Sequence, residues 1–179
     1  MHRSDTTIHL SSEEQDHLLA VASLFEGTFS IDWIQELTKS KASLVLMTFE
    51  NAVLKGLIKR GDIGSFSFSD PKTCKQWQEK LSPKDKEDYH RRIAAMLMYD
   101  LSDSEQNLEL VTPHLLHISN DIAGCQWLMR AADKYRSTFQ TDAALQCYSK
   151  ILDDLSGHYD EDTDQLFCDA AIKYSKLTT

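Results

Sequence analysis

"SLVLMTFENAVLKGLIKRGDIGSFSFSD", residues 43–70, contains the pattern that decides the fold of the first half of the chain. Apolar residues recur at helical spacing from Ser43 to Lys55, and Gly56 follows as a helix stop. "LIKR" and "SFSFS" then alternate at period two on either side of "GDIG", which is the pattern of a tight β-hairpin. The stretch therefore predicts a helix followed by a two-stranded hairpin.

The helix over 43–55 offers few side chains that could read DNA. Contacts to base edges come mainly from Arg, Lys, Asn and Gln, whereas here Glu50, Asn51 and Lys55 stand among mostly apolar residues. So many apolar residues predict burial on more than one side of the helix. Lys59 and Arg60 in the hairpin are the candidate phosphate contacts if the element binds DNA, and we expect that it does not.

The segments on both sides of this stretch are predicted to be helical, and their starts carry recognisable caps. Upstream, we expect one helix from Ser11 or Ser12 to Gly27 and a short one capped by Ser30. Downstream, Asp70 and Pro71 start a helix to about Leu81, and Ser82 and Pro83 start a longer one to about Leu101. Pro113 leaves 105–118 open between one kinked helix and two short ones.

The last third of the chain contains a repeat. "WLMRAADKY" (127–135) matches "LFCDAAIKY" (166–174) at a constant spacing of 39 residues, with Ala-Ala-x-Lys-Tyr shared. Between them "TDAALQCYSKILDDL" (141–155) has apolar residues on one helical face. This arrangement predicts an array of antiparallel helical hairpins.

Composition places the chain among ordinary globular proteins. The 179 residues are 41% hydrophobic and 26% charged, values that disordered and fibrous chains do not show. No apolar run approaches the roughly 20 residues of a membrane span, and the N-terminus lacks the apolar core of a signal peptide. We therefore expect a cytoplasmic protein without membrane contact, whose four scattered cysteines are reduced and mostly packed.

The net charge of −9 is unevenly distributed. Residues 12–100 hold 14 acidic and 12 basic side chains (net −2), and residues 101–179 hold 13 acidic and 6 basic ones (net −7). Because Lys and Arg supply most of the affinity for nucleic acids, neither half is suited to binding a polyanion.

Three segments resemble one known family: "LLAVASLFEGTFSIDWIQEL", "FENAVLKGLI" and "FSFSDPKTCKQWQEKLSPKDKEDYHRRIAAML". They are similar to the winged-helix segment that follows the ATPase module in STAND-type signal-transduction ATPases, such as large LuxR-type transcription activators and ATPase-containing cyclases and kinases. In that family tetratricopeptide-like hairpins follow the winged helix, as 127–155 would here. The resemblance covers residues 12–179.

The sequence departs from this family in having no nucleotide-binding loop. Family members carry a P-loop upstream, but no GxxxxGK[ST] occurs here, and the six glycines never cluster. The resemblance then implies a fragment of a larger protein, with ATP bound only by a missing upstream domain. We expect this chain to hold no cofactor of its own.

Catalytic and metal sites are not indicated by any motif. His114 and His117 are three residues apart and could point the same way on a helix, but spacing places no third ligand. No Ser-His-Asp or Cys-His arrangement has a recognisable local motif. We expect a chain that is not an enzyme and binds no metal.

These observations predict a mainly α protein in three parts. Residues 1–11 would be a tag or loose lead-in, 12–81 a small winged-helix domain, and 82–179 a helical linker with tetratricopeptide-like hairpins truncated at the C-terminus. The function expected is that of a non-catalytic regulatory arm in signal transduction or transcription regulation, and the alternative is a free-standing winged-helix DNA-binding regulator. Partners would be another protein or the missing ATPase domain. Self-association would use the last helix, with Leu166, Phe167, Tyr174 and Leu177 as the contact residues.

Overall fold

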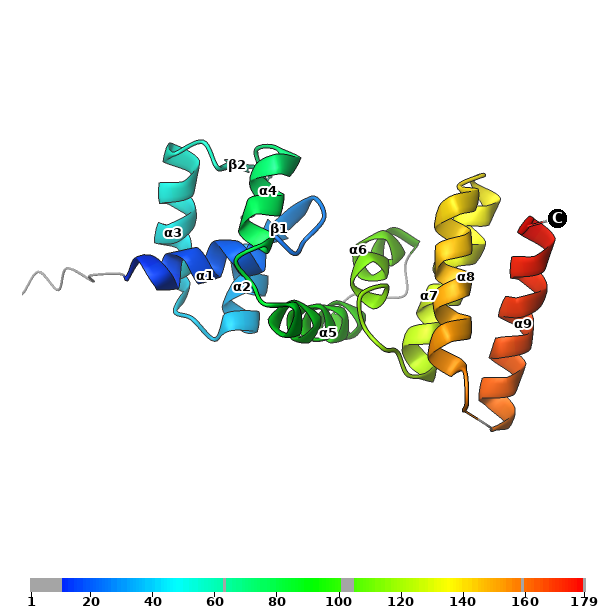
Figure 1. Cartoon of the computed structure of the whole chain (residues 1–179). Helices are drawn as coiled ribbons and strands as arrows, with labels where there is room; N and C mark the ends of the chain where they lie inside the picture. The colour runs from blue at the N-terminus through cyan, green and yellow to red at the C-terminus, as the bar shows by residue number, and fades with distance from the viewer. Residues whose placement is uncertain (1–10, 63, 101–104, 159, 179) are drawn as a thin grey trace, which may run out of the picture. The chain divides into compact units, whose positions relative to one another are not determined.

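The computed structural model describes residues 11–62, 64–100, 105–158 and 160–178, and this part of the chain is mainly helical (Figure 1). It forms two compact units, Met1–Tyr89 and His90–Thr179, that divide within helix α5. The first unit contains α1 (Ser12–Ala22), β1 (Thr28–Ser30), α2 (Ile31–Thr38), α3 (Ala42–Leu54), β2 (Ile58–Arg60), β3 (Ser65–Phe68), α4 (Pro71–Gln78) and the start of α5 (Pro83–Asp100). The second contains the rest of α5, α6 (Glu105–Leu115), α7 (Ile122–Ser137), α8 (Thr141–Leu155) and α9 (Glu161–Thr178).

Side-chain caps fix the starts of several helices, as the sequence predicts. The hydroxyl of Ser11 accepts a hydrogen bond from the backbone N–H of Glu14, and that of Ser30 accepts one from Trp33. The carboxylate of Asp70 accepts one from the N–H of Thr73, which lowers the pKa of Asp70. Each cap satisfies a donor that the first turn would otherwise leave unpaired.

The sheet of the first unit has three antiparallel strands, so the expectation of two strands was incomplete. β3 lies in the centre, with Ser67 paired to Thr28 of β1 on one side and to Lys59 of β2 on the other. β1 has only three residues, too few for an alternating pattern to stand out. Its last residue, Ser30, also caps α2, and that cap was the stronger signal.

An aromatic cluster forms the core of the first unit. The ring centroids of Phe29 and Phe49 lie 5.4 Å apart, and those of Phe49 and Phe66 5.1 Å apart. These three rings are buried and join β1, α3 and β3. The helix α1 ends at Ala22, before the expected Gly27, yet Phe25 is still buried in the turn that follows.

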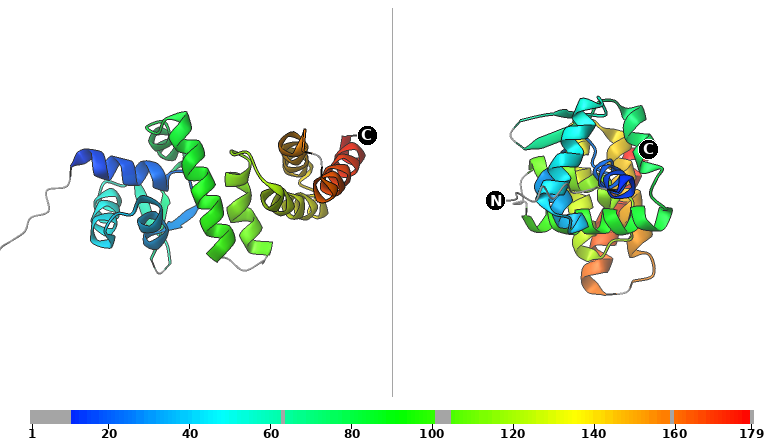
Figure 2. Two further views of the ribbon diagram at one scale, coloured as in Figure 1. Left: turned by 90° about the horizontal axis from the view of Figure 1, so that it is seen from below. Right: turned by 90° about the vertical axis from the view of Figure 1, so that its left-hand side faces the viewer.

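The second unit contains α7, α8 and α9 side by side, as Figure 1 and the left view of Figure 2 show. Its core comes from small and aliphatic residues, with Leu128, Ala132 and Ile151 fully buried. α6 is a single helix with Pro113 inside it, which decides between the two alternatives for 105–118.

A polar anchor joins the turn before α7 to α8. The side-chain amide of Asn120 donates to the Asp154 carboxylate at 2.6 Å and to the carbonyl of Leu115 at 2.9 Å. Asp154 also pairs with Lys150 at 2.6 Å.

Among the described residues, no helix is long and apolar enough to cross a membrane.

Candidate functional site

The two candidate phosphate contacts differ in what surrounds them. Lys59 and Arg60 both lie on β2 and both are exposed. The guanidinium of Arg60, however, forms an ion pair with the carboxylate of Glu50 on α3. The pair places a negative charge next to one of the two cations, which weakens the attraction of this edge for a phosphate.

The outer side of α3 exposes apolar residues rather than base-reading ones. Leu54 is 85% exposed and Leu46 is 43% exposed, and Glu50 lies between them at helical spacing of four residues. The expectation that α3 is covered on more than one side is therefore wrong at these two leucines. This side of α3 therefore presents apolar surface and few donors for base edges.

The four residues predicted to mediate self-association lie on α9 and are all half-buried. They are Leu166, Phe167, Tyr174 and Leu177. Leu166 lines a groove of about 430 Å³ together with Ala123, Gln126, Trp127, Met129 and Arg130 of α7. Ala170, on the same helix, is fully buried, and Leu166 already lies beside α7, so part of the predicted face is covered within the second unit.

An ion-pair network connects α7, α8 and α9. Lys173 of α9 lies 2.8 Å from the carboxylate of Asp133 on α7 and 3.0 Å from that of Asp169, and the hydroxyl of Tyr148 on α8 donates to Asp133 at 2.7 Å. Burial raises the pKa of Asp133, but the bonds from Lys173 and Tyr148 outweigh it and hold that pKa below its usual value. Asp133 is thus the acceptor that ties three helices together.

The repeated lysine of Ala-Ala-x-Lys-Tyr has the same role in both copies. Lys134 of α7 lies 3.0 Å from the carboxylate of Glu109 on α6. Lys173, its equivalent 39 residues later, reaches back in the same way to Asp133 on α7. In both copies the lysine therefore pairs with an acidic residue of an earlier helix, on α6 for Lys134 and on α7 for Lys173.

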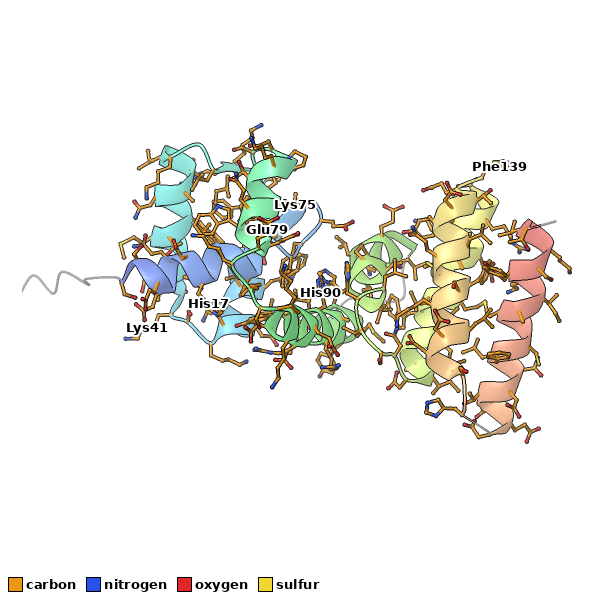
Figure 3. All side chains as sticks on the ribbon, viewed as in Figure 1. His17, Lys41, Lys75, Glu79, His90 and Phe139 are labelled. Atoms are coloured by element: carbon orange, nitrogen blue, oxygen red, sulfur yellow. The ribbon has the colours of Figure 1, made fainter. Side chains whose placement is uncertain are left out.

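Three histidines of the second unit lie together, and two of them were singled out from the sequence. Nδ1 of His90, on α5, lies 2.9 Å from Nδ1 of His114, on α6, and both rings are buried. The ring of His117 stacks on His90 at 4.5 Å between centroids. His90 is labelled in Figure 3.

Burial affects the protonation of His114. Burial, followed by the nearby His90 and His117, lowers the pKa of His114 to about 3. The Nδ1 atoms of His90 and His114 point at each other, and the ring of His117 stacks face to face on that of His90. The contact between His90 and His114 gives each buried ring a polar partner across α5 and α6. Among the described residues, no group of His, Cys, Asp or Glu has the arrangement of a metal site.

The cysteines separate into buried and accessible thiols. Burial raises the pKa of Cys147 to about 12, and burial with the nearby carboxylates of Asp154 and Asp121 does the same for Cys125. Cys74 is half-buried, with its pKa raised by burial, and Cys168 on α9 is exposed. All four are free, and the two buried thiols lack the thiolate character of a nucleophile.

Comparison with known proteins adds no further evidence: no family model, curated protein or solved structure matches the chain.

One exposed apolar residue of α9 is not among those predicted from the sequence. Ile172 is 52% exposed and stands at the repeat position that Asp133 occupies in α7. The aligned repeat contained this signal, because an isoleucine replaces a charged residue there. The pairing of Arg60 with Glu50 and of His90 with His114 had no such signal, since both join distant parts of the sequence.

Proposed function

We propose that the chain is a non-catalytic regulatory arm that binds protein, as part of a larger signal-transduction ATPase or transcriptional regulator. In this proposal the first unit is a winged helix used for packing, and the second is a tetratricopeptide-like array that receives a partner. Nucleotide chemistry belongs to an ATPase module upstream in the same polypeptide.

The observation that carries the proposal is the outer surface of α3 and β2. The first unit has the order helix, strand, helix, helix, hairpin, in which α3 stands where a winged helix would read DNA. Its outward side presents Leu46 and Leu54, and Glu50 pairs with Arg60. These side chains favour an apolar protein contact over a phosphate backbone.

The competing function is a free-standing winged-helix regulator that binds DNA. Exposed Lys59 favours it, together with the order of elements in the first unit. The net charge of −9 opposes it, because phosphate contacts need clustered cations.

A titration with duplex DNA separates the two functions. We expect no saturable change in the fluorescence anisotropy of a labelled mixed-sequence duplex at physiological salt, and at most weak binding at low salt. Tight, salt-sensitive binding that Lys59→Glu with Arg60→Glu abolishes would establish the DNA-binding function instead. Lys55→Glu, an exposed lysine just after α3, tests whether a loss of binding is specific to the hairpin.

A second titration tests the assignment of nucleotide chemistry to another module. The chain has no glycine-rich loop whose backbone N–H groups could surround a triphosphate. Calorimetry with Mg-ATP should therefore give no saturable heat. A micromolar site would contradict the proposal that this arm is non-catalytic and nucleotide-free.

A further inference from the structure

One face of α9 is open, although the same positions of α7 are covered. This forward face consists of Asp164, Cys168, Ala171 and Ile172, which are spaced as i, i+4, i+7 and i+8 and so lie on one side of the helix. Ala171 is half-buried and the other three are exposed. Phe167, half-buried, lies at its edge.

The equivalent face of α7 shows what covers such a surface. Its residues, 39 positions earlier, are Cys125, Met129, Ala132 and Asp133, and the first three are buried. α8 and α9 share this cover: Tyr148 of α8 and Lys173 of α9 both donate to Asp133, and Lys173 also lies 3.6 Å from the sulfur of Met129. At the start of α7, the charges of Asp154 and Lys150 of α8 act on Cys125. α8 therefore runs antiparallel to α7, with its C-terminal end beside the start of α7.

The differences between the two faces define what the open one would accept. Asp164 of α9 occupies the position that Cys125 has in α7. A helix that packs on α9 as α8 packs on α7 should therefore carry a cation at the position that Asp154 has in α8. Ile172 of α9 occupies the position that Asp133 has in α7. The same partner helix should therefore carry an apolar side chain at the position that Tyr148 has in α8. Ala171 keeps the small side chain of Ala132, which allows close approach of the two helices.

The negative charges at the start of α9 favour the same kind of helix. Asp160, Glu161 and Asp164 line a hollow of about 570 Å³ together with Gln165 and Cys168. The bonds from Thr163 lower the pKa of Asp160, so this carboxylate stays charged at neutral pH. An apolar face that ends in three carboxylates complements a helix that is apolar along one side and basic at its C-terminal end.

We propose that the forward face of α9 binds an amphipathic, C-terminally basic helix of a partner protein, antiparallel to α9. The inference rests on the proposed function, because it names the ligand of the arm. A second copy of the chain is a poorer occupant, since it brings the same carboxylates and a net charge of −9 to the contact.

A peptide derived from α8 provides the probe. It comprises residues 141–155 with Tyr148→Leu and Asp154→Lys, so that it carries both changes that the face requires. We expect saturable binding to the full chain, at least roughly tenfold tighter at low salt than for a peptide with Tyr148→Leu alone, because the unchanged Asp154 would face Asp164.

Variants of the protein test where the peptide lies. Asp164→Lys should reverse the preference between the two peptides, and Ile172→Ser should weaken both roughly tenfold. Both residues are exposed, so folding should be preserved, as circular dichroism would check. Asp162→Lys is the matched control: it changes the same charge in the same turn, but on the opposite side of α9, and should leave the preference unchanged.

Two kinds of result would overturn the proposal. The first is that the peptide shows no saturable binding, or that Asp164→Lys leaves the preference between the two peptides unchanged. The second is concentration-dependent dimerisation that Ile172→Ser abolishes, which would make a second copy the occupant. The DNA and Mg-ATP titrations are independent of both, so the regulatory-arm function can survive the loss of this particular ligand.

Discussion

Helices α7 and α9 share Ala-Ala-x-Lys-Tyr but differ in how much of each is covered. Ala131 and its equivalent Ala170 are both buried. Ala132 is also fully buried, whereas its equivalent Ala171 is only half-buried. The same short motif thus occurs in one helix whose second alanine is fully buried and in one whose second alanine is half-buried. The neighbouring helix, rather than the motif, decides which side of the helix belongs to the core.

The largest expected effect comes from enlarging the paired alanines. Ala132→Leu adds bulk to a fully packed position and should lower the free energy of unfolding by about 3 kcal/mol. Ala171→Leu should change it by less than about 1 kcal/mol, because its side chain partly faces solvent. Urea unfolding of both variants measures the difference, and equal losses would mean that α9 is covered as α7 is.

Acidification should lower the free energy of unfolding of the second unit. The pKa of His114 is about 3 in the fold, against an ordinary value of 6.5, so the unfolded chain binds more protons between these values. The stability contributed by neutral His114 is complete above about pH 6.5 and is lost as the pH falls. Between pH 7 and pH 5 we expect a loss of about 2 kcal/mol.

Trp127 can report this loss, because it is the only tryptophan of the second unit. In a background with Trp33→Phe and Trp77→Phe, its fluorescence follows urea unfolding of that unit at each pH. His114→Gln keeps a hydrogen-bonding group near His90 but does not titrate, so it should flatten the pH dependence. An unchanged slope in this variant would show that other groups are responsible.

Removal of Asp133 should have a smaller effect, concentrated at α9. Asp133→Ala leaves Lys173 and Tyr148 without their shared acceptor and should cost about 1.5 kcal/mol. Glu109→Ala, which removes the exposed partner of Lys134, is the control and should cost less than about 0.5 kcal/mol. Similar values for the two variants would argue against a special role for the three-helix network.

Local features of the fold were predictable from the sequence, and distant pairings were not. The caps by Ser11, Ser30 and Asp70 act within three residues, so sequence spacing alone reveals them. β1 was missed because three residues carry no period. The relation between α7 and α9 was visible as a repeat in the sequence, but the identity of the open face required knowing that Tyr148 meets Asp133.

The candidate site was only partly predictable for the same reason. Lys59 and Arg60 were identifiable as cations, yet the ion pair of Arg60 with Glu50 depends on how β2 approaches α3. Leu166, Phe167, Tyr174 and Leu177 share an apolar face, but periodicity does not say which side meets α8. Exposed Ile172 could have been found by comparing the two repeats position by position.

The smallest effect concerns thiol reactivity, which compares the two helices without destabilising either. Cys168 lies on the forward face of α9 and is exposed, whereas Cys125 is fully buried at a covered position of α7. A maleimide reagent at neutral pH should label Cys168 within minutes and Cys125 only through unfolding. Peptide mapping by mass spectrometry would identify the order, and equal rates would contradict it.

The most direct test of the contrast between α7 and α9 is amide hydrogen exchange on the intact chain at low concentration. We predict that the amides of α7 exchange only by global unfolding of the second unit, while those of α9 exchange at least about a hundredfold faster through local opening. The faster exchange follows from an open forward face. Equal protection of the two helices would contradict the account, because α9 would then be as fully covered as its repeat partner.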